Sequence, residues 1–170
     1  MRRAFTIAIL IILSYLIQTV LFSFQDLSGQ APNLLLILTM SFGIMRGRRE
    51  GMLTGFFSGF MYDLYFSDTI IGPFMLLFML IGYANGFFHK KFMMQDIMLP
   101  VIIIFIDELV FNLIIYIGLF LMRNRTDIGY YFKYIFMPQA IYTVLVTAII
   151  YRLYVVINKR IKKQTEKKVI

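Results

Sequence analysis

The stretch EGMLTGFFSGFMYDL, residues 50–64, decides the fold of this chain. Gly51, Gly55, Gly59 and Asp63 follow one another at intervals of four residues through this otherwise apolar segment. Glycine is a poor helix former in water, and a lone carboxylate is costly in apolar surroundings. Residues four apart nevertheless lie along one side of an α-helix. The pattern therefore indicates a helix in a membrane, where small residues let a second helix approach closely.

The composition of the whole chain indicates an integral membrane protein. Its 170 residues are 60% hydrophobic and 15% charged, with a mean hydropathy of +0.78, whereas soluble domains average about 45–50% apolar and about 25% charged residues. The absence of cysteine excludes disulfides and thiolate metal sites. The single histidine, His89, lies in the basic run HKK, and we expect it in a solvated loop. We expect neither a metal nor a cofactor.

Six apolar runs predict an all-α fold, a bundle of six transmembrane helices forming one domain over residues 1–158. The runs cover residues 4–24, 31–46, 51–66, 69–88, 97–122 and 134–157. Because a span needs about 20 residues, the second and third runs are short, and we expect them to form a hairpin with a tight polar turn at residues 47–50. The first run is too long for a signal peptide and lacks a cleavage motif, so we expect a retained signal-anchor helix.

The basic residues predict the orientation of the bundle. Most of the 17 Lys and Arg residues fall on one side of it, the exceptions being Arg123, Arg125 and Lys133 in the last loop. The positive-inside bias then places both termini in the cytoplasm, as in a multi-pass protein of the cytoplasmic (inner) membrane. The net charge of +8 gathers at the ends of apolar runs, so it predicts anionic lipids at the cytoplasmic face as partners and no nucleic acid.

The end of the chain, INKRIKKQTEKKVI, residues 157–170, is too polar to be a span. Residues 159–170 are expected to form a basic cytoplasmic tail. Two interpretations remain open for it. One is a disordered tail attracted to lipid headgroups, and the other is a docking site for a cytoplasmic partner.

Further glycines add small surface to the fourth apolar run. Gly72 lies near its start, and Gly82 and Gly86 are again four residues apart. Tight packing in lipid depends on such close approach. The spacing predicts close helix packing but leaves two partners open, a helix of the same chain or a helix of another molecule.

Three carboxylates lie inside apolar runs. Asp63 is expected in the outer half of the membrane near Asp68, and Asp107 and Glu108 fall near the middle of the fifth run, with Asn112 one turn beyond Glu108. Each such acid costs about 2.5–3.5 kcal/mol on insertion scales and normally faces the bundle interior or water. Adjacent helical residues point about 100° apart, so Asp107 and Glu108 cannot face the same narrow seam.

Three roles remain open for these acids: an internal polar network that fixes the fold, a proton or solute path, and a contact with a transmembrane helix of a partner. No Lys or Arg inside the apolar runs is available to pair with them. Hydrogen bonds to Asn112, Gln18, Asn85 or tyrosines are therefore the expected solution. Asp107, Glu108 and Asn112 are the candidates for the internal network.

Enzyme motifs are absent from the sequence. It contains no G-x-S-x-G, H-E-x-x-H, P-loop or G-x-G-x-x-G pattern. Membrane enzymes usually cluster His, Asp or Glu near an interface, whereas the acids here are scattered. We therefore expect a protein without catalytic activity.

The run GMLTGFFSGFMYDLYFSDTIIGPFMLLFMLIGYANGFF, residues 51–88, resembles the core signature of the bacterial rod shape-determining protein MreD family. That signature combines a glycine ladder, an aspartate four residues later, a short loop, another glycine and a G-Y-x-x-G-like pair. The matching residues, which are also the candidates for helix packing or a partner interface, are Gly51, Gly55, Gly59, Asp63, Gly72, Gly82, Tyr83 and Gly86. The Asp107–Glu108 pair is not part of the signature.

The resemblance implies a non-enzymatic scaffold subunit of the cell-elongation machinery. Members of the family associate with MreC, and through it they join MreB filaments to peptidoglycan synthases. In its six-helix arrangement the family is also similar to the substrate-binding subunits of energy-coupling-factor transporters. That similarity implies an alternative function, a subunit of a membrane transporter that binds a small, vitamin-like molecule. Likeness of fold alone does not fix function.

Overall fold

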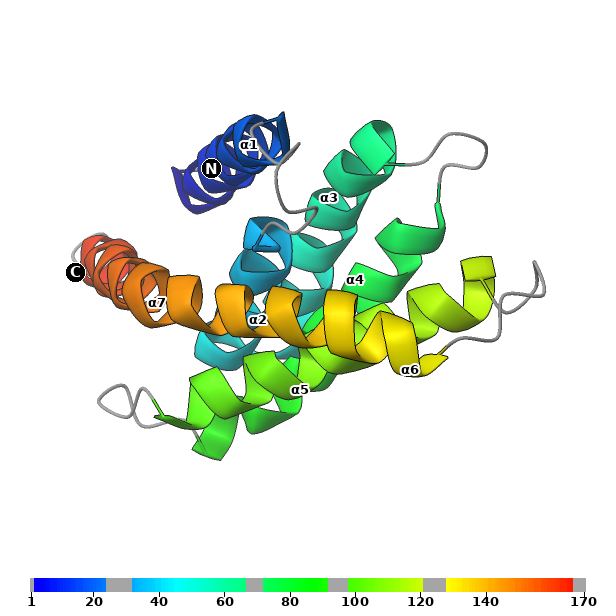
Figure 1. Cartoon of the computed structure of the whole chain (residues 1–170). Helices are drawn as coiled ribbons and strands as arrows, with labels where there is room; N and C mark the ends of the chain where they lie inside the picture. The colour runs from blue at the N-terminus through cyan, green and yellow to red at the C-terminus, as the bar shows by residue number, and fades with distance from the viewer. Residues whose placement is uncertain (1, 24–31, 67–71, 92–97, 121–127, 167–170) are drawn as a thin grey trace.

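The computed structural model describes residues 2–23, 32–66, 72–91, 98–120 and 128–166, and all its regular elements there are helical (Figure 1). Asp68, Arg123 and Arg125 lie outside these residues. In chain order the α-helices are α1 (Arg2–Ser23), α2 (Leu34–Arg46), α3 (Arg48–Phe66), α4 (Pro73–Asn85), α5 (Met98–Ile115), α6 (Ile128–Tyr131) and α7 (Met137–Glu166). A 3₁₀ segment, Gly86–Lys91, continues α4, and π-helical segments, Tyr116–Phe120 and Phe132–Phe136, continue α5 and join α6 to α7.

Two stretches within the described residues are long and apolar enough to cross a membrane. They are Met98–Gly118, which contains α5, and Gly129–Asn158, which contains most of α7. Shorter apolar helical stretches are Phe5–Val20 within α1, Leu34–Arg46 and Pro73–His89.

The short helix α2 is the centre of the bundle. Every residue from Leu34 to Met45 is buried, because α1, α3, α4, α5 and α7 all contact this helix. Thirteen residues span only about 20 Å at about 1.5 Å per residue. A helix this short can lie wholly inside the bundle, with its polar backbone ends satisfied by protein groups.

The start of α2 shows how these ends are satisfied. The N–H groups of the first helical turn have no partner within the helix itself. Asn33 Oδ1 accepts a hydrogen bond from the Leu36 N–H at 3.1 Å, and Gln18 Oε1, which comes from α1, accepts one from the Leu35 N–H at 3.0 Å. Gln18, considered above as a partner for the intramembrane acids, therefore caps α2 instead.

Helices α5 and α7 lie side by side and cross the group formed by α2, α3 and α4 (Figure 1). Four aromatic rings join α5 to α3 and α4. The Tyr62 ring lies 4.9 Å from Phe74, 5.3 Å from Phe78 and 5.9 Å from Phe111, measured between ring centroids. Tilted and edge-to-face pairs at these distances stabilise a core beyond their buried area.

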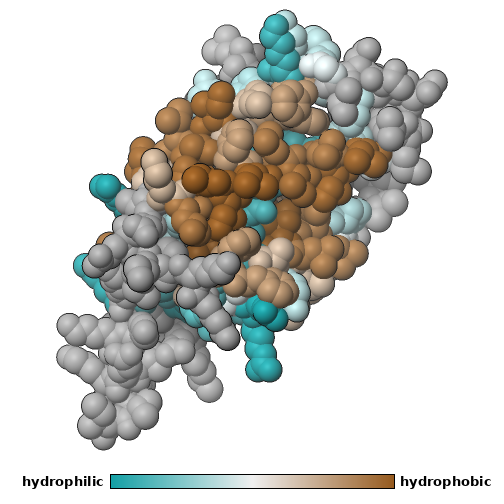
Figure 2. Space-filling view, turned by 90° about the horizontal axis from the view of Figure 1, so that it is seen from below, coloured by the Kyte–Doolittle hydropathy of each residue, from teal (hydrophilic) through white to brown (hydrophobic). Residues whose placement is uncertain are grey.

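The outer surface of the bundle is largely apolar. Exposed leucine, isoleucine, valine and phenylalanine side chains occur on α1, α3, α4, α5 and α7, and Figure 2 shows one such face as a broad hydrophobic surface. An exposed apolar surface of this extent on a soluble protein would cause association. On a membrane protein it is the surface that faces lipid.

Two predicted boundaries are wrong. Residues 47–50 were expected to form a turn, but α3 begins at Arg48 and Gly47 alone separates it from α2. Gly47 makes so short a connection possible because its φ is +92°, in a region that side chains disfavour, and its N–H bonds to the Gly43 carbonyl at 2.8 Å. One of the two interpretations of residues 159–170 was a disordered tail, but α7 continues through them as far as Glu166, since Lys, Arg, Gln and Glu are good helix formers.

Candidate functional site: the glycine-lined contact between α3 and α4

The glycines of residues 50–64 lie where α3 packs against the antiparallel helix α4. A side chain on Gly51 would occupy the space of the Gly82 carbonyl, and one on Gly55 would occupy that of the Phe78 carbonyl. A Cβ atom at either position would collide with backbone, which cannot move aside as a flexible side chain could. The two helix backbones are therefore in direct contact, the arrangement that small residues permit in lipid.

The same stripe continues to Asp63. Gly59 packs against the backbone of Phe74 and Met75 at the start of α4. One turn later, the buried carboxylate of Asp63 accepts hydrogen bonds from the Phe74 N–H at 3.3 Å and the Met75 N–H at 2.8 Å. Because α4 is antiparallel, a four-residue step along α3 corresponds to one turn back along α4. Asp63 follows Gly59 by one turn and therefore lies opposite the first residues of α4, where a carboxylate can bind free N–H groups.

The start of α4 needs this carboxylate. The residue at its N-cap position is Gly72, which has a φ of +132° and offers no side-chain cap, and Pro73 follows as the first helical residue. The N–H groups that Asp63 binds are those which a local Asp, Ser or Asn cap would normally satisfy. A carboxylate at a helix N-terminus also interacts favourably with the helix dipole. Asp63 thus caps α4 from the neighbouring helix.

At the other end of the contact a third helix joins. Gly43 of α2 packs against the Gly82 carbonyl and Asn85, and Gly86 packs against the backbone of Arg48. Gly43 lies eight residues before Gly51, so the four-residue spacing that singles out the ladder extends upstream to it. That spacing is the signal that could have identified Gly43 from the sequence.

Tyr83, the aromatic residue of the predicted signature, lies outside this packed contact and is exposed. The Arg48 guanidinium lies 3.6 Å from the Phe87 ring centroid and 5.9 Å from that of Tyr83. Such cation–π contacts hold a cation at an apolar surface. Tyr83 and Phe87 therefore seat Arg48 on the outside of the bundle, at the end where α3 begins.

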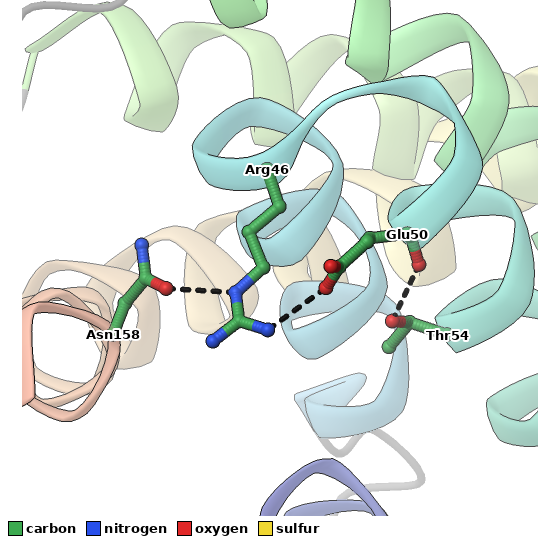
Figure 3. Close-up of polar contacts among 4 residues, drawn as sticks. All are labelled: Arg46, Glu50, Thr54 and Asn158. Atoms are coloured by element: carbon green, nitrogen blue, oxygen red, sulfur yellow. Dashed lines mark hydrogen bonds and ion pairs between the residues drawn. The ribbon is translucent and has the colours of Figure 1, made fainter. Parts of the chain in front are cut away.

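A second polar cluster, not predicted from the sequence, ties α7 to the α2–α3 connection (Figure 3). Arg46 donates from Nε to Asn158 Oδ1 at 2.7 Å and from Nη1 to Glu50 Oε2 at 2.8 Å, while the Thr54 hydroxyl donates to the Glu50 carbonyl at 2.7 Å. Arg46 and Glu50 are four residues apart, a spacing typical of ion pairs, but no pattern links them to Asn158. This long-range contact could be found only from the fold.

His89 is exposed, as predicted for a solvated residue, but it does not lie in a loop. It lies in the 3₁₀ segment after α4, and its Nδ1–H donates to the Ile44 carbonyl at 2.9 Å. Its ring lies beside Gly47, the residue that connects α2 to α3. The histidine thus caps the C-terminus of α2, where donor side chains satisfy the last carbonyl groups of a helix.

The two adjacent acids of α5 face different surroundings. Asp107 is partly exposed, and its Oδ2 atom accepts a hydrogen bond from Asn85 Nδ2 at 2.6 Å. Glu108 is fully buried. The amides of Asn112 and Gln139 lie beside its carboxylate, and neither is at good hydrogen-bond geometry to its oxygens. Asp107 therefore belongs to the α4–α5 contact and Glu108 to the α5–α7 contact.

No metal site is evident in the parts of the chain that the structure describes, because no three His, Cys, Asp or Glu side chains come together there. The geometry is that of close helix packing, and the glycine stripe is occupied by α4 of the same chain. The side of α3 that remains open carries large apolar residues, namely Leu53, Phe56, Phe57, Phe60 and Leu64.

The packed contact contains the residues that resemble the MreD signature except Gly72, which is the N-cap residue of α4, and Tyr83, which is exposed. In comparisons with known proteins, no curated protein and no solved structure matches the chain. The rod shape-determining protein MreD family matches residues 1–160, which is nearly the whole sequence. This chain belongs to the MreD family of rod shape-determining proteins.

Proposed function

We propose that this chain is a non-enzymatic scaffold of the cell-elongation machinery, which binds MreC and helps to couple MreB filaments to peptidoglycan synthesis. Membership of the MreD family gives the chain a role in rod shape determination and a place in the membrane. The proposal adds the specific partners to this role. It is supported by one observation, which is that the signature residues hold α3 and α4 together in the structure.

Those residues make a rigid body. Gly51, Gly55 and Gly59 bring two backbones into contact, and Asp63 fixes the start of α4 against α3. A scaffold must present its outer faces in a fixed geometry, because ordering them at the moment of binding would reduce affinity. Backbone-to-backbone packing around a buried central helix supports this role.

We also propose that the chain crosses the membrane six times with both termini in the cytoplasm. The hydrogen bond from Arg46 to Asn158 supports this topology, because it joins the basic connection between α2 and α3 to the basic end of α7. Arg48 and Arg49 lie at the same connection. A basic face of this kind favours the cytoplasmic side and attracts anionic lipids there.

The experiment is affinity purification of the tagged chain from membranes of its own rod-shaped cells, combined with depletion of the chain. Recovery of an MreC-type protein and rounding of depleted cells are the expected results. If no MreC-type protein is recovered and depleted cells keep their shape, the proposal fails. Where a glycine of the α3–α4 contact is substituted in these assays, Gly118→Ala is the matched control, since a Cβ atom at Gly118 would meet nothing within 4 Å.

One observation favours the alternative function, a vitamin-binding subunit of a transporter arranged like those of energy-coupling-factor systems. Glu108 is buried beside Asn112 and Gln139 without a hydrogen bond to either of its carboxylate oxygens, and a ligand could satisfy these atoms. A thermal-shift screen of the purified protein against vitamins separates the two functions. A ligand that stabilises wild type but not Glu108→Gln would favour the transporter.

A further inference from the structure

The carboxylate of Asp107 lies in an unusual place for a charged group. It sits within Met98–Gly118, one of the two stretches long enough to cross a membrane, and it is partly exposed. Its neighbours on the open side of α5 are apolar: Ile102, Ile106 and Val110 are exposed. Of the three polar side chains of α5, Glu108 and Asn112 are buried, so Asp107 alone brings polarity to this outer surface.

Asn85 holds the carboxylate at this surface. Its Nδ2 atom donates to Asp107 Oδ2 at 2.6 Å and to the Ile81 carbonyl of its own helix at 2.9 Å. Asn85 itself is buried and packs against Gly43 at the glycine contact. The orientation of Asp107 is therefore set by the most tightly packed part of the bundle.

The described part of the chain offers Asp107 no cation. Arg46 pairs with Glu50, and Arg48 is seated on Phe87. A partly exposed carboxylate in apolar surroundings is costly without a cation, even when an amide donates a hydrogen bond to it. A molecular surface that keeps an oriented carboxylate in an apolar surround suits a partner that brings the missing positive charge.

Space for such a partner exists beside Asp107. Ala84, next to Asn85 on α4, is exposed, and its small side chain would let another backbone approach. Large apolar residues are also exposed here, namely Leu80 on α4, Phe87 in the 3₁₀ segment that follows it and Ile106 on α5. Figure 2 shows hydrophilic atoms enclosed by hydrophobic surface on one face of the bundle. Small residues beside a hydrogen-bonding group are the usual composition of helix contacts in lipid.

We propose that the surface around Asp107, Asn85 and Ala84 binds a membrane-spanning helix of a partner protein through a Lys or Arg side chain that pairs with Asp107. The inference rests on the proposed function, since it assigns a surface and a chemistry to the partner of the scaffold. Charge complementarity favours such a helix, because a Lys or Arg side chain would neutralise the carboxylate of Asp107. Asp107 is fixed in depth and direction, which suits a side chain carried at one position of a helix.

The test is copurification of an MreC-type protein with variants of the full-length chain expressed in its own cells. Asp107→Asn keeps the shape and the acceptor for Asn85 but removes the charge, and Asp107→Leu removes both. We expect at least a tenfold loss of recovered partner for Asp107→Leu and a smaller loss for Asp107→Asn. Phe57→Leu, on the open side of α3 away from this surface, is the matched control and should retain the partner.

Photocrosslinking gives a second measurement that does not depend on affinity. A photoreactive residue at position 106 or 110 should crosslink to the membrane-spanning segment of the partner, and one at position 57, on the open side of α3, should not. Size-exclusion profiles and yields equal to wild type establish that the Asp107 variants fold. If Asp107→Leu does not fold, the near-isosteric variant Asp107→Asn carries the test.

The outcomes separate the two proposals. If wild type recovers no MreC-type protein, the proposed function fails. If wild type and both Asp107 variants recover it equally, the function stands and the assignment of this surface is overturned. A lipid amine as the true ligand would also overturn it. In that case purified wild type, but not Asp107→Leu, would be more thermostable in phosphatidylethanolamine nanodiscs than in phosphatidylcholine nanodiscs, while partner recovery stayed unchanged.

Discussion

The carboxylate of Asp63 accepts a hydrogen bond from the backbone N–H of Met75 at 2.8 Å, so α3 supplies the N-cap that α4 lacks. This relationship gives the aspartate of the glycine ladder a physical role. Without it, the first N–H groups of α4 would be left unsatisfied in the interior of a membrane protein, where no water replaces the lost partner.

Asp63→Ala should lower the stability of the protein by about 1–2 kcal/mol, the upper part of the range for loss of a helix cap. Asp63→Asn, which keeps one acceptor oxygen, should lose less. Thermal unfolding of the purified variants in detergent measures both. Equal stability of wild type and Asp63→Ala would show that the cap contributes nothing.

Gly55→Ala should destabilise the bundle by about 1–3 kcal/mol, the usual cost of overpacking a filled core, because its Cβ would collide with the Phe78 backbone. Gly55→Leu should abolish complementation of a depletion strain. The comparison variant is Phe57→Leu on the exposed side of the same helix, which should complement. Complementation by both leucine variants would refute the packing role of the ladder.

Arg46→Lys should loosen the end of α7, because an ammonium cannot reproduce the fork that binds Asn158 and Glu50 together. The Glu50 side chain is 38% exposed, so solvent weakens that pair and the Asn158 contact should dominate. A double-mutant cycle of Arg46→Ala and Asn158→Ala should give a coupling free energy of about 1 kcal/mol. Hydrogen exchange near residue 158 should be faster in either single variant, and an unchanged rate would contradict the link.

Glu108→Gln should leave the protein as stable as wild type or more stable. Neither carboxylate oxygen has a hydrogen bond of good geometry, and a buried carboxyl group without such bonds contributes little that a neutral amide of the same shape would lose. Asp107→Gln on the partly exposed side of α5 provides the comparison for a general effect of added amide. A clear fall in the melting temperature of Glu108→Gln alone would show that the charge has a partner.

A stripe of residues four apart can be recognised in a sequence, because four-residue spacing on a helix is a purely local property. Gly51, Gly55, Gly59 and Asp63 all face α4 as one row. The partner of Asp63 could not be predicted, since it depends on the height at which α4 begins. Gly72 and Pro73, which set that height, lie in a different segment of the chain.

Long-range polar contacts were beyond the sequence for the same reason. Asn85 was foreseen as one of several possible partners for the α5 acids, and it bonds to Asp107. Gln18 was foreseen in the same way but caps α2. Both amides can donate or accept in any direction, so only the relative placement of helices decides which group each one meets.

The complete enclosure of α2 has a consequence for the synthesis of the protein. Helices α5 and α7, which help to cover α2, are made after it, so part of α2 stays uncovered until the last third of the chain has left the ribosome. In the folded protein Thr39 and Ser41 donate their hydroxyl protons to carbonyls of α2 itself, at 2.9 and 2.6 Å. The buried hydroxyl groups of the most enclosed helix thus need no partner from the two helices that are made last.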